Sequence, residues 1–365
     1  MPLKICAALF AAVFTAASHS ATLRILNWGD YLDPDVVKGF EAQHSVTIEY
    51  VEFNNSDEFT ELFFDTNNQF DVIFPASDSV SILKDNKLIE KLDKTRFKNY
   101  QNINQVVLDG LKLQDTNNQY SVPYLWGTTG IGFNKQALKR HGIEAKDISW
   151  SLIFDKELRQ KVSKCGIGVV NERDEIFSAA LNYLGHSINT TDKTELKAAG
   201  ALIKEAYTDF TYLHTNQYTD DLKNNKICVG VGYSGDILAQ IEENPDIDYV
   251  IPSQGATMWI DVMAIPTNSP SPDLAYLFID YLMAAASSAK NSNYAAYPTP
   301  MLDAQPLVEP EILSNKTIYP NAITLASLNM IAPSNKKVRR IKHRLWVRAI
   351  CIKGKWCSVP MRSIL

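Results

Sequence analysis

The chain is poor in the residues and motifs that bind metals or phosphate. It contains five cysteines and six histidines among 365 residues, with no Cys-x-x-Cys pair and no histidine at metal-ligand spacing from a cysteine. A zinc site is therefore unsupported, and we predict neither a metal nor another cofactor. A glycine-rich phosphate loop and a Gly-x-Ser-x-Gly elbow are also missing, so no motif of a phosphate-loop enzyme or a serine hydrolase is present.

Long apolar runs are equally scarce, and the only one lies at the extreme N-terminus. Residues 5–17 are almost wholly apolar, Lys4 precedes them, and residues 18–20 offer small side chains before a cleavage site. We interpret residues 1–20 as a secretory signal peptide that is removed before Ala21, which places the mature protein in the periplasm. A multi-span membrane protein is excluded.

Acidic and basic residues are unevenly distributed along the chain. The formal net charge of 36 − 41 = −5 includes a tail, residues 336–362, with ten basic residues and no acid. Residues 1–20 hold one basic residue, so residues 21–335 carry 25 − 41 = −16. An acidic body disfavours nucleic acid as a partner and favours cations, although the same charge also serves plain solubility.

The first part of the chain alternates between strand and helix patterns. Asp33 and Pro34 have the preferences of an N-cap and a first helical position, so a helix should begin there. A second helix is predicted around residues 56–64. The three predicted strands are residues 23–27, 46–53 and 70–75. The order β-α-β-α-β is typical of a parallel sheet with helices on its faces, so the fold class is α/β.

The rest of the chain continues this alternation. We predict helices over residues 174–183 and 192–209 and buried strands over residues 227–233 and 258–266. At about 150 residues per domain, a chain of this length suggests two domains or one large one. A glycine-rich segment, residues 126–134, could separate two lobes.

Aromatic and acidic side chains recur together near the ends of predicted strands. The pairs are Trp28 with Asp30, Tyr233 with Asp236, and Trp259 with Asp261, and two further side chains at strand ends are Tyr31 and Asp78. Ligands of open α/β sheets bind beyond the carboxyl ends of the strands. Carboxylates bind ammonium groups, and aromatic faces attract the same cations and cover an alkyl chain. The pattern therefore suits an elongated aliphatic amine.

A glycoside hydrolase with paired carboxylates is the alternative that these residues leave open, because aromatic side chains also stack on sugars. The sequence does not select an acid and a nucleophile among its 41 acidic residues.

Several segments make the chain resemble a known family. Residues 25–34, 70–75, 122–134, 171–177, 233–236, 259–261, 264–266 and 297–300 are similar, in this order, to periplasmic polyamine-binding proteins. The resemblance implies a two-lobed α/β fold of the type II-like periplasmic binding proteins, in which each lobe is a mainly parallel sheet flanked by helices and the ligand lies between the lobes. One lobe would comprise residues 21–128 and 258–307, and the other residues 129–257 and 308–355.

The function that this resemblance implies is binding without catalysis. The protein would capture a polyamine, putrescine first and spermidine next, and deliver it as a monomer to the permease subunits of an inner-membrane ATP-binding-cassette importer. A polyamine sensor that docks on a membrane signalling protein remains an alternative.

The resemblance also assigns site residues, position by position. The aromatic walls would be Trp28, Tyr31, Tyr233, Trp259 and Tyr297. The ammonium-binding carboxylates would be Glu175, Asp236 and Asp261, with Asp30 also near the cleft. Glu172 matches a position that is acidic in spermidine-binding relatives, and Thr215 matches a serine that hydrogen-bonds the ligand. The chain departs from the family at Ala76, where a serine is usual, and at Asp78, which adds a carboxylate.

Four cysteines remain after signal cleavage, in an oxidising compartment where cystines are favoured, but their spacing leaves the pairing open. The resemblance implies a disulfide between Cys165 and Cys228, because putrescine-binding relatives have a cross-link at the matching positions. Cys351 and Cys357 could pair with each other. Residues 356–365 run beyond the family's usual end and have no assigned role.

Overall fold

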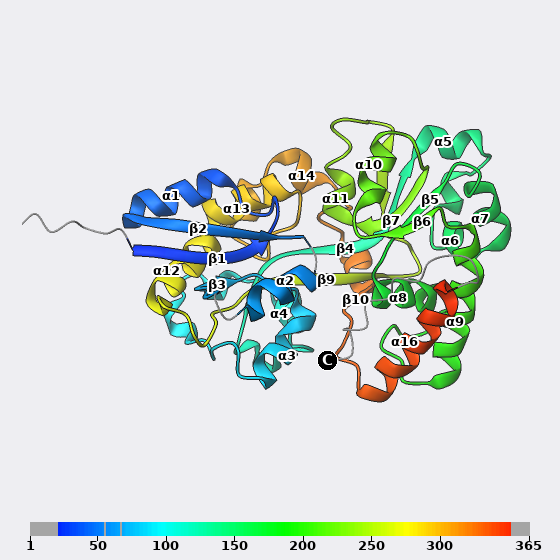
Figure 1. Cartoon of the computed structure of the whole chain (residues 1–365). Coiled ribbons are helices and arrows are strands. Elements are labelled where there is room, and N and C mark those ends of the chain that lie inside the picture. The colour runs from blue at the N-terminus through cyan, green and yellow to red at the C-terminus, as the bar shows by residue number, and fades with distance from the viewer. Residues whose placement is uncertain (1–20, 55, 66–67, 352–365) are drawn as a thin grey trace, which may run out of the picture.

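The computed structural model describes residues 21–54, 56–65 and 68–351. The predicted signal peptide, the C-terminal extension and Cys357 lie outside these residues. Within them, two bodies lie side by side, and two long strands, β4 (Val122–Asn134) and β9 (Ala256–Met263), run from one body into the other (Figure 1). No helix in the described ranges combines the length and the apolar character that crossing a bilayer requires.

The first body contains a parallel sheet in the order β2-β1-β3. Its strands are β1 (Ala21–Trp28), β2 (Val46–Phe53) and β3 (Val72–Ile73). The predicted strand over residues 70–75 is thus shorter than expected, because Pro75 has no N–H with which to extend the ladder. Antiparallel bridges from Ile73 to Ala264 and from Ala76 to Asp261 continue the sheet toward β9.

Helices cover both faces of this sheet because successive β1 side chains point to opposite sides. Leu23 and Ile25 pack with α1 (Pro34–His44), α12 (Pro272–Met283) and α13 (Ala285–Ala295), whereas Leu26 packs with α2 (Ser56–Phe64), α3 (Val80–Asp85) and α4 (Gln105–Leu111). The predicted start of α1 is confirmed, since the Asp33 carboxylate accepts a hydrogen bond from the backbone N–H of Asp35.

The second sheet has seven strands in the order β10-β9-β4-β7-β5-β6, with β8 paired to β4. Its remaining strands are β5 (Ile167–Val170), β6 (Tyr212–His214), β7 (Val229–Tyr233), β8 (Ile247–Val250) and β10 (Leu328–Asn329). β6, β5 and β7 are parallel, and β4 runs antiparallel to β7, β8 and β9. The parallel part of this sheet therefore has its carboxyl edge at the ends of β5, β6 and β7.

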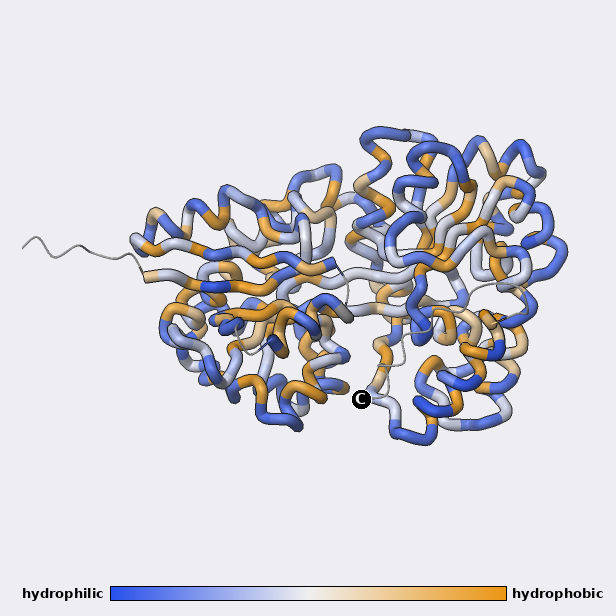
Figure 2. The backbone as a smooth tube through the Cα atoms, viewed as in Figure 1, coloured by the Kyte–Doolittle hydropathy of each residue, from blue (hydrophilic) through white to orange (hydrophobic). Residues whose placement is uncertain are grey.

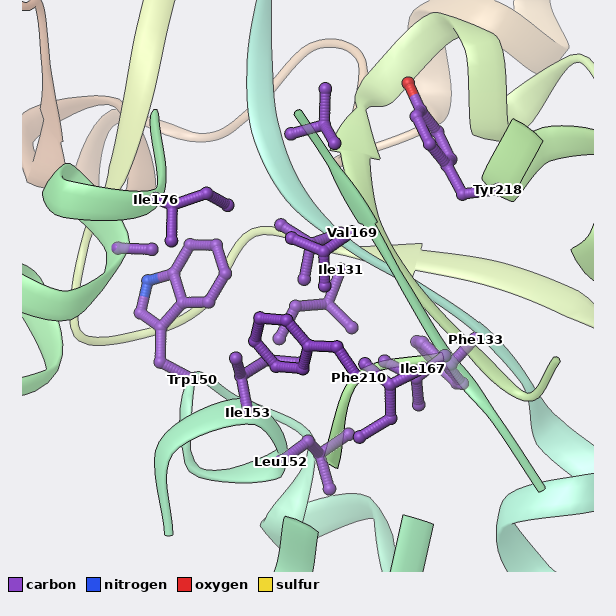
Figure 3. Close-up of a cluster of buried hydrophobic side chains, with 14 of the residues drawn as sticks. Ile131, Phe133, Trp150, Leu152, Ile153, Ile167, Val169, Ile176, Phe210 and Tyr218 are labelled. Carbon is purple, nitrogen blue, oxygen red and sulfur yellow. The ribbon is translucent and has the colours of Figure 1, made fainter. Parts of the chain in front are cut away.

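The helices of the second body enclose its own hydrophobic core. They are α5 (Lys135–Arg140), α6 (Ser151–Phe154), α7 (Lys156–Val162), α8 (Arg173–Tyr183), α9 (Lys193–Ala206), α10 (Gln217–Lys223), α11 (Ser234–Leu238) and α16 (Lys336–Ile350). Two short helices, α14 (Pro310–Ser314) and α15 (Ala322–Ser327), follow α13 along the chain. Figure 3 shows Trp150, Ile176 and Tyr218 among the buried side chains of this core. Each body has buried hydrophobic clusters of its own, and Figure 2 shows hydrophobic stretches of chain in both. This agrees with a two-lobed fold, and the exact lobe limits stay a prediction.

The glycine-rich segment predicted as a crossover between two lobes, residues 126–134, is the larger, C-terminal part of strand β4, which runs from one body into the other. All thirteen residues of β4 are buried; its first part pairs with β9 and its last part with β7. Glycine at position 127 is required because a Cβ there would lie 2.4 Å from the Trp259 ring. The connection between the bodies is therefore a hydrogen-bonded strand with an aromatic ring packed on it.

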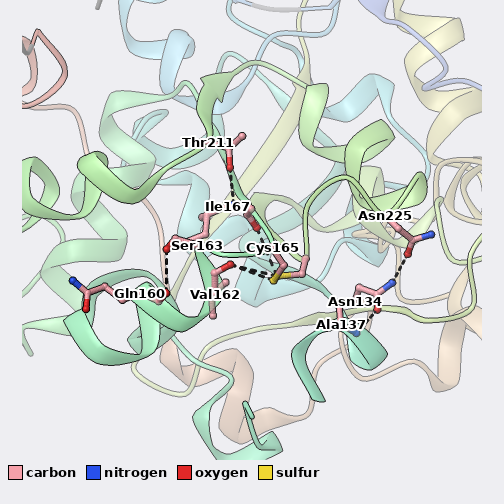
Figure 4. Close-up of a disulfide and its surroundings, with 11 residues drawn as sticks. Asn134, Ala137, Gln160, Val162, Ser163, Cys165, Ile167, Thr211 and Asn225 are labelled. Atoms are coloured by element: carbon pink, nitrogen blue, oxygen red, sulfur yellow. Dashed lines mark hydrogen bonds between the residues drawn. A yellow bond between two sulfur atoms is a disulfide. The ribbon is translucent and has the colours of Figure 1, made fainter. Parts of the chain in front are cut away.

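The predicted disulfide is confirmed. Cys165 and Cys228 are bonded, with their Cα atoms 5.6 Å apart and 63 positions between them in the sequence (Figure 4). The bond joins the turn after α7 to the segment that leads into β7. It therefore fastens two neighbouring parts of the second body close to the amino ends of parallel strands.

Candidate functional site

A buried tyrosine–carboxylate pair lies in the first body. Tyr31 follows the end of β1, and its hydroxyl donates a 2.8 Å hydrogen bond to Oδ2 of Asp261 on β9. Tyr124 on β4 fixes the backbone here, since its hydroxyl donates to the carbonyl oxygen of Tyr31. Asp261 is 6% exposed, and burial raises its pKa to about 8, against the opposing effect of the Tyr31 hydrogen bond.

A second carboxylate, Asp236, stands at the start of α11 in the second body. It accepts hydrogen bonds of 3.1 Å from the hydroxyls of Tyr218 and Tyr297. Burial raises the pKa of Asp236, and these two hydrogen bonds lower it in part. Tyr297 packs in the core of the first body, so its bond to Asp236 joins the two bodies. The Tyr297 ring lies so close that a Cβ at Gly235 would be 2.2 Å from it.

Aromatic rings fill the space between these two carboxylates. Tyr297 meets Tyr31 with ring centroids 5.6 Å apart and Trp259 with centroids 5.1 Å apart, both edge-on. Trp259 in turn meets Tyr233 at 5.7 Å. The indole Nε1 atoms of Trp28 and Trp259 are buried and have no hydrogen-bond partner within the described residues. Two unpaired donors beside a ring cluster indicate a place where a ligand or water is bound.

A third group of carboxylates faces the same region from the start of α8 and from the loop after β3. Burial raises the pKa of Glu175 to about 7, and Asp78 and Asp174 add to this through their negative charge. The Oε2 atom of Glu175 is buried without a partner in the described chain. Asp78 is exposed to solvent, yet desolvation by the surrounding protein still raises its pKa. Asp78, Asp174 and Glu175 therefore lie close enough to act on one another's charge, and they gather negative charge in this part of the molecule.

The other predicted site residues are less closely connected. Glu172 is exposed at the N-cap of α8, and Thr215 is half-buried directly after β6. Because β5, β6 and β7 are parallel, both lie at the same sheet edge as Tyr233. Asp30 is exposed, with a φ of 51°, and its charge adds to the burial that raises the pKa of Tyr294. Asp30 thus lies near enough to Tyr294 to act on it through its charge.

The sequence profile of the bacterial extracellular solute-binding proteins matches residues 35–320. The chain belongs to this family. The resemblance seen in the sequence and the two-lobed α/β fold expected from it are both confirmed.

Relatives and solved structures agree with this membership. This solute-binding protein is 31% identical over 339 residues to the putrescine-binding periplasmic protein SpuD of Pseudomonas aeruginosa, covering 91% of this chain and 92% of that one. It is 34% identical over 350 residues to a putrescine/cadaverine-binding protein of the same species, covering 93% and 97%. The structure of the spermidine/putrescine ABC transporter substrate-binding protein PotD from Streptococcus pneumoniae superposes with a TM-score of 0.80 at 26% identity, covering 90% and 98%.

Sequence reasoning missed two residues that shape the site of this solute-binding protein. The hydroxyl of Tyr218 on α10 donates a hydrogen bond to Asp236. In the sequence Tyr218 precedes Leu222 by four residues, which is the spacing of two core side chains on one face of a helix, so its role was not visible. A weak signal was present in Gly232, since glycine in a buried strand often admits a large neighbour, and a Cβ there would lie 2.2 Å from the Tyr218 ring. Lys342 pairs with Asp174 at 3.0 Å from 168 residues away, which no local pattern reveals.

The raised carboxyl pKa values predict how the stability of the ligand-free protein depends on pH. Asp261 and Glu175 hold protons in the folded protein up to about pH 8 and 7, above their ordinary values of 3.8 and 4.5. Their contribution to the free energy of unfolding is complete below about pH 4 and is lost as the pH rises to 8. Asp261→Asn should remove the contribution of Asp261 to this pH dependence, which is on the order of a few kcal/mol. Urea unfolding of the unmodified protein and of the variant at pH 5 and pH 8 measures this contribution. An equal loss of stability between the two pH values in both proteins would contradict the assignment.

Proposed function

We propose that this protein captures a polyamine, putrescine first and spermidine next, and delivers it to the permease subunits of an ATP-binding-cassette importer. The names of its relatives support this ligand class. The proposal includes removal of the signal peptide, a periplasmic location, a monomeric protein and the lobe limits predicted from the sequence. It assigns the protein no catalytic activity, in keeping with a family of binding proteins.

The observation that carries the proposal is the alternation of carboxylates and rings. Asp261 and Asp236 belong to different bodies and are connected through the edge-on tyrosines Tyr31 and Tyr297. A diaminoalkane has an ammonium group at each end and methylenes between, which matches two carboxylates with an aromatic surface between them. Its binding would engage groups of both bodies, as closure of a hinge around a ligand requires.

Glu175 supplies the strongest single reason to expect a cation. Within the described residues its carboxyl has one buried oxygen, Oε2, without a partner, and it has two acidic neighbours, Asp78 and Asp174. Hydrogen bonds from Thr129 and Thr257 oppose the rise of the Glu175 pKa. A buried unpaired acceptor is costly, and an ammonium donor would satisfy it. We assign Glu175, Asp236 and Asp261 to the ammonium groups, and Trp28, Tyr31, Tyr233, Trp259 and Tyr297 to the alkyl chain. Asp78 is a further acidic contact, and Asp30, Glu172 and Thr215 lie at the edge of the proposed site.

Titration calorimetry of the mature protein tests this function. Putrescine and spermidine should bind, and butylamine, which has the same alkyl chain as putrescine but one ammonium group, should bind at least about tenfold more weakly, since one charge-assisted contact is worth roughly 1.5–3 kcal/mol. Absence of heat with either polyamine, together with turnover of a glycoside, would establish the hydrolase alternative instead. Polyamine uptake by a deletion strain then separates transport from sensing: unchanged uptake would contradict the importer role.

A further inference from the structure

Helix α16 presents a surface of one charge. Every exposed residue of this fifteen-residue helix is basic. These residues, here called the basic face, are Lys336, Lys337, Arg339, Arg340, Arg344 and Arg348. Four of them, at positions 336, 340, 344 and 348, are spaced by four and so form one stripe, which is about 18 Å long at 1.5 Å per residue. In Figure 1, α16 lies at the lower edge of the second body, beside α9.

The other side of α16 accounts for its folding without the basic face. Val338, Ile341, Trp346 and Ala349 are buried against the second body. Lys342 is buried as well and makes the ion pair with Asp174 described above. The helix is therefore anchored by an apolar stripe and one internal ion pair, and the six exposed charges are surplus to that anchoring.

No carboxylate compensates the basic face within the described residues. Its side-chain hydrogen bonds in that part of the chain go to carbonyl oxygens: Arg339 donates to Ser334, and Arg344 donates to Arg340. Like charges spaced by four residues on a helix repel each other. Six cations without a carboxylate partner in the described chain are therefore a cost to the isolated protein.

The neighbouring helix α9 extends this charge. Leu345 of α16 packs against Gly200 of α9, which accepts it because glycine has no side chain; a Cβ there would lie 3.0 Å from that of Leu345. Lys197 and Lys204 are three residues before and four residues after Gly200, so they lie on the same side of α9, and both are exposed. The positive surface thus spans two packed helices.

The acidic residues in the body of α9 are engaged elsewhere. Glu205 pairs with the buried Arg159 at 3.3 Å, and Glu195 lies 3.5 Å from His186. Neither neutralises the lysines that flank Gly200.

We propose that the basic face docks on an anionic phospholipid surface. Protein interfaces are depleted of lysine and of charge at their centres and use aromatic anchors, and α16 exposes neither an aromatic nor an apolar residue. A continuous row of cations instead suits the uniform charge of lipid headgroups, where each Lys or Arg strengthens binding about fivefold. The sequence after the helix adds three basic residues and no acid. Repulsion of the acidic body is screened beyond about 8 Å at physiological salt, so the charge asymmetry orients α16 toward the membrane.

Vesicle co-sedimentation tests this docking independently of ligand binding. The mature protein should sediment with vesicles that contain phosphatidylglycerol, should stay in solution with pure phosphatidylcholine vesicles, and should be released by 0.5 M salt. A variant with Lys336, Arg340, Arg344 and Arg348 replaced by glutamine should partition about 100-fold more weakly or worse. The matched control replaces four exposed lysines outside the basic face by glutamine, which changes the net charge by the same amount. These lysines are Lys91, Lys98, Lys139 and Lys316.

The control variant should bind these vesicles as the unmodified protein does and should keep its melting temperature. The stripe variant should melt at the unmodified temperature or slightly above it, because fewer like charges repel along α16. Equal loss of binding in both variants would reduce the effect to net charge and overturn the proposal. Failure of the unmodified protein to bind anionic vesicles at low salt would also overturn it. So would salt-sensitive self-association that the stripe variant abolishes without any vesicle binding, because the occupant of the basic face would then be a second copy of this chain.

Discussion

Replacing Asp261 by asparagine should weaken putrescine binding by about 30-fold or more. Asp261 is 6% exposed, and in the part of the chain that the structure describes its side chain accepts one hydrogen bond, from Tyr31 to Oδ2, which leaves Oδ1 for an ammonium group. Removing one partner of a buried, hydrogen-bonded charge pair costs about 2–5 kcal/mol, and 1.4 kcal/mol corresponds to a factor of ten. Asparagine keeps the shape and can still accept from Tyr31, so the change isolates the charge. Titration calorimetry gives the dissociation constants.

A matched control is Asp109→Asn on α4, where an exposed carboxylate pairs with Lys112 at 2.6 Å. This variant carries the same charge change and should bind putrescine as the unmodified protein does. Because the pKa of Asp261 is about 8 without ligand, binding near neutral pH should also release protons, and affinity should increase from pH 6 to pH 8. Unchanged affinity and unchanged proton release in Asp261→Asn would remove this residue from the site.

Loss of the Cys165–Cys228 disulfide should lower the free energy of unfolding by about 4 kcal/mol. The bond closes a loop across 63 positions, and in the chain-entropy model a loop of this size restricts the unfolded chain by about that amount. The double variant Cys165→Ser/Cys228→Ser removes the bond without leaving a lone thiol. Urea unfolding at one protein concentration measures the difference.

Reduction provides the control for this prediction. A reductant should destabilise the unmodified protein by a similar amount, and the double variant should respond much less. The loop carries Glu175 and Thr215, so any change in putrescine affinity reports how far the bond also orders the site. A difference below about 1 kcal/mol between the two proteins would show that the bond contributes little.

The local elements of this protein follow from short stretches of sequence. Asp33 and Pro34 start α1 because capping and a fixed proline φ act within one turn. The alternation of side chains in β2 and the apolar character of β1 indicate strands, and their order along the chain indicates a parallel sheet. Trp28 and Tyr233 are the last residues of β1 and β7, and Tyr31 and Asp236 follow shortly after them. These positions near strand ends were also visible, since the carboxyl edge of such a sheet is fixed by topology.

The sequence by itself determined the α/β class and predicted an acidic, aromatic site near strand ends, because these features depend on neighbours along the chain. Trp259 and Asp261 lie instead inside β9. The tertiary structure alone decided that β4 crosses between the bodies, that Tyr218 and Tyr297 hold one carboxylate, and that Lys342 pairs with Asp174. Those contacts join residues up to 168 positions apart, and burial, which raises the pKa of Asp261 and Glu175, exists only once both bodies have packed.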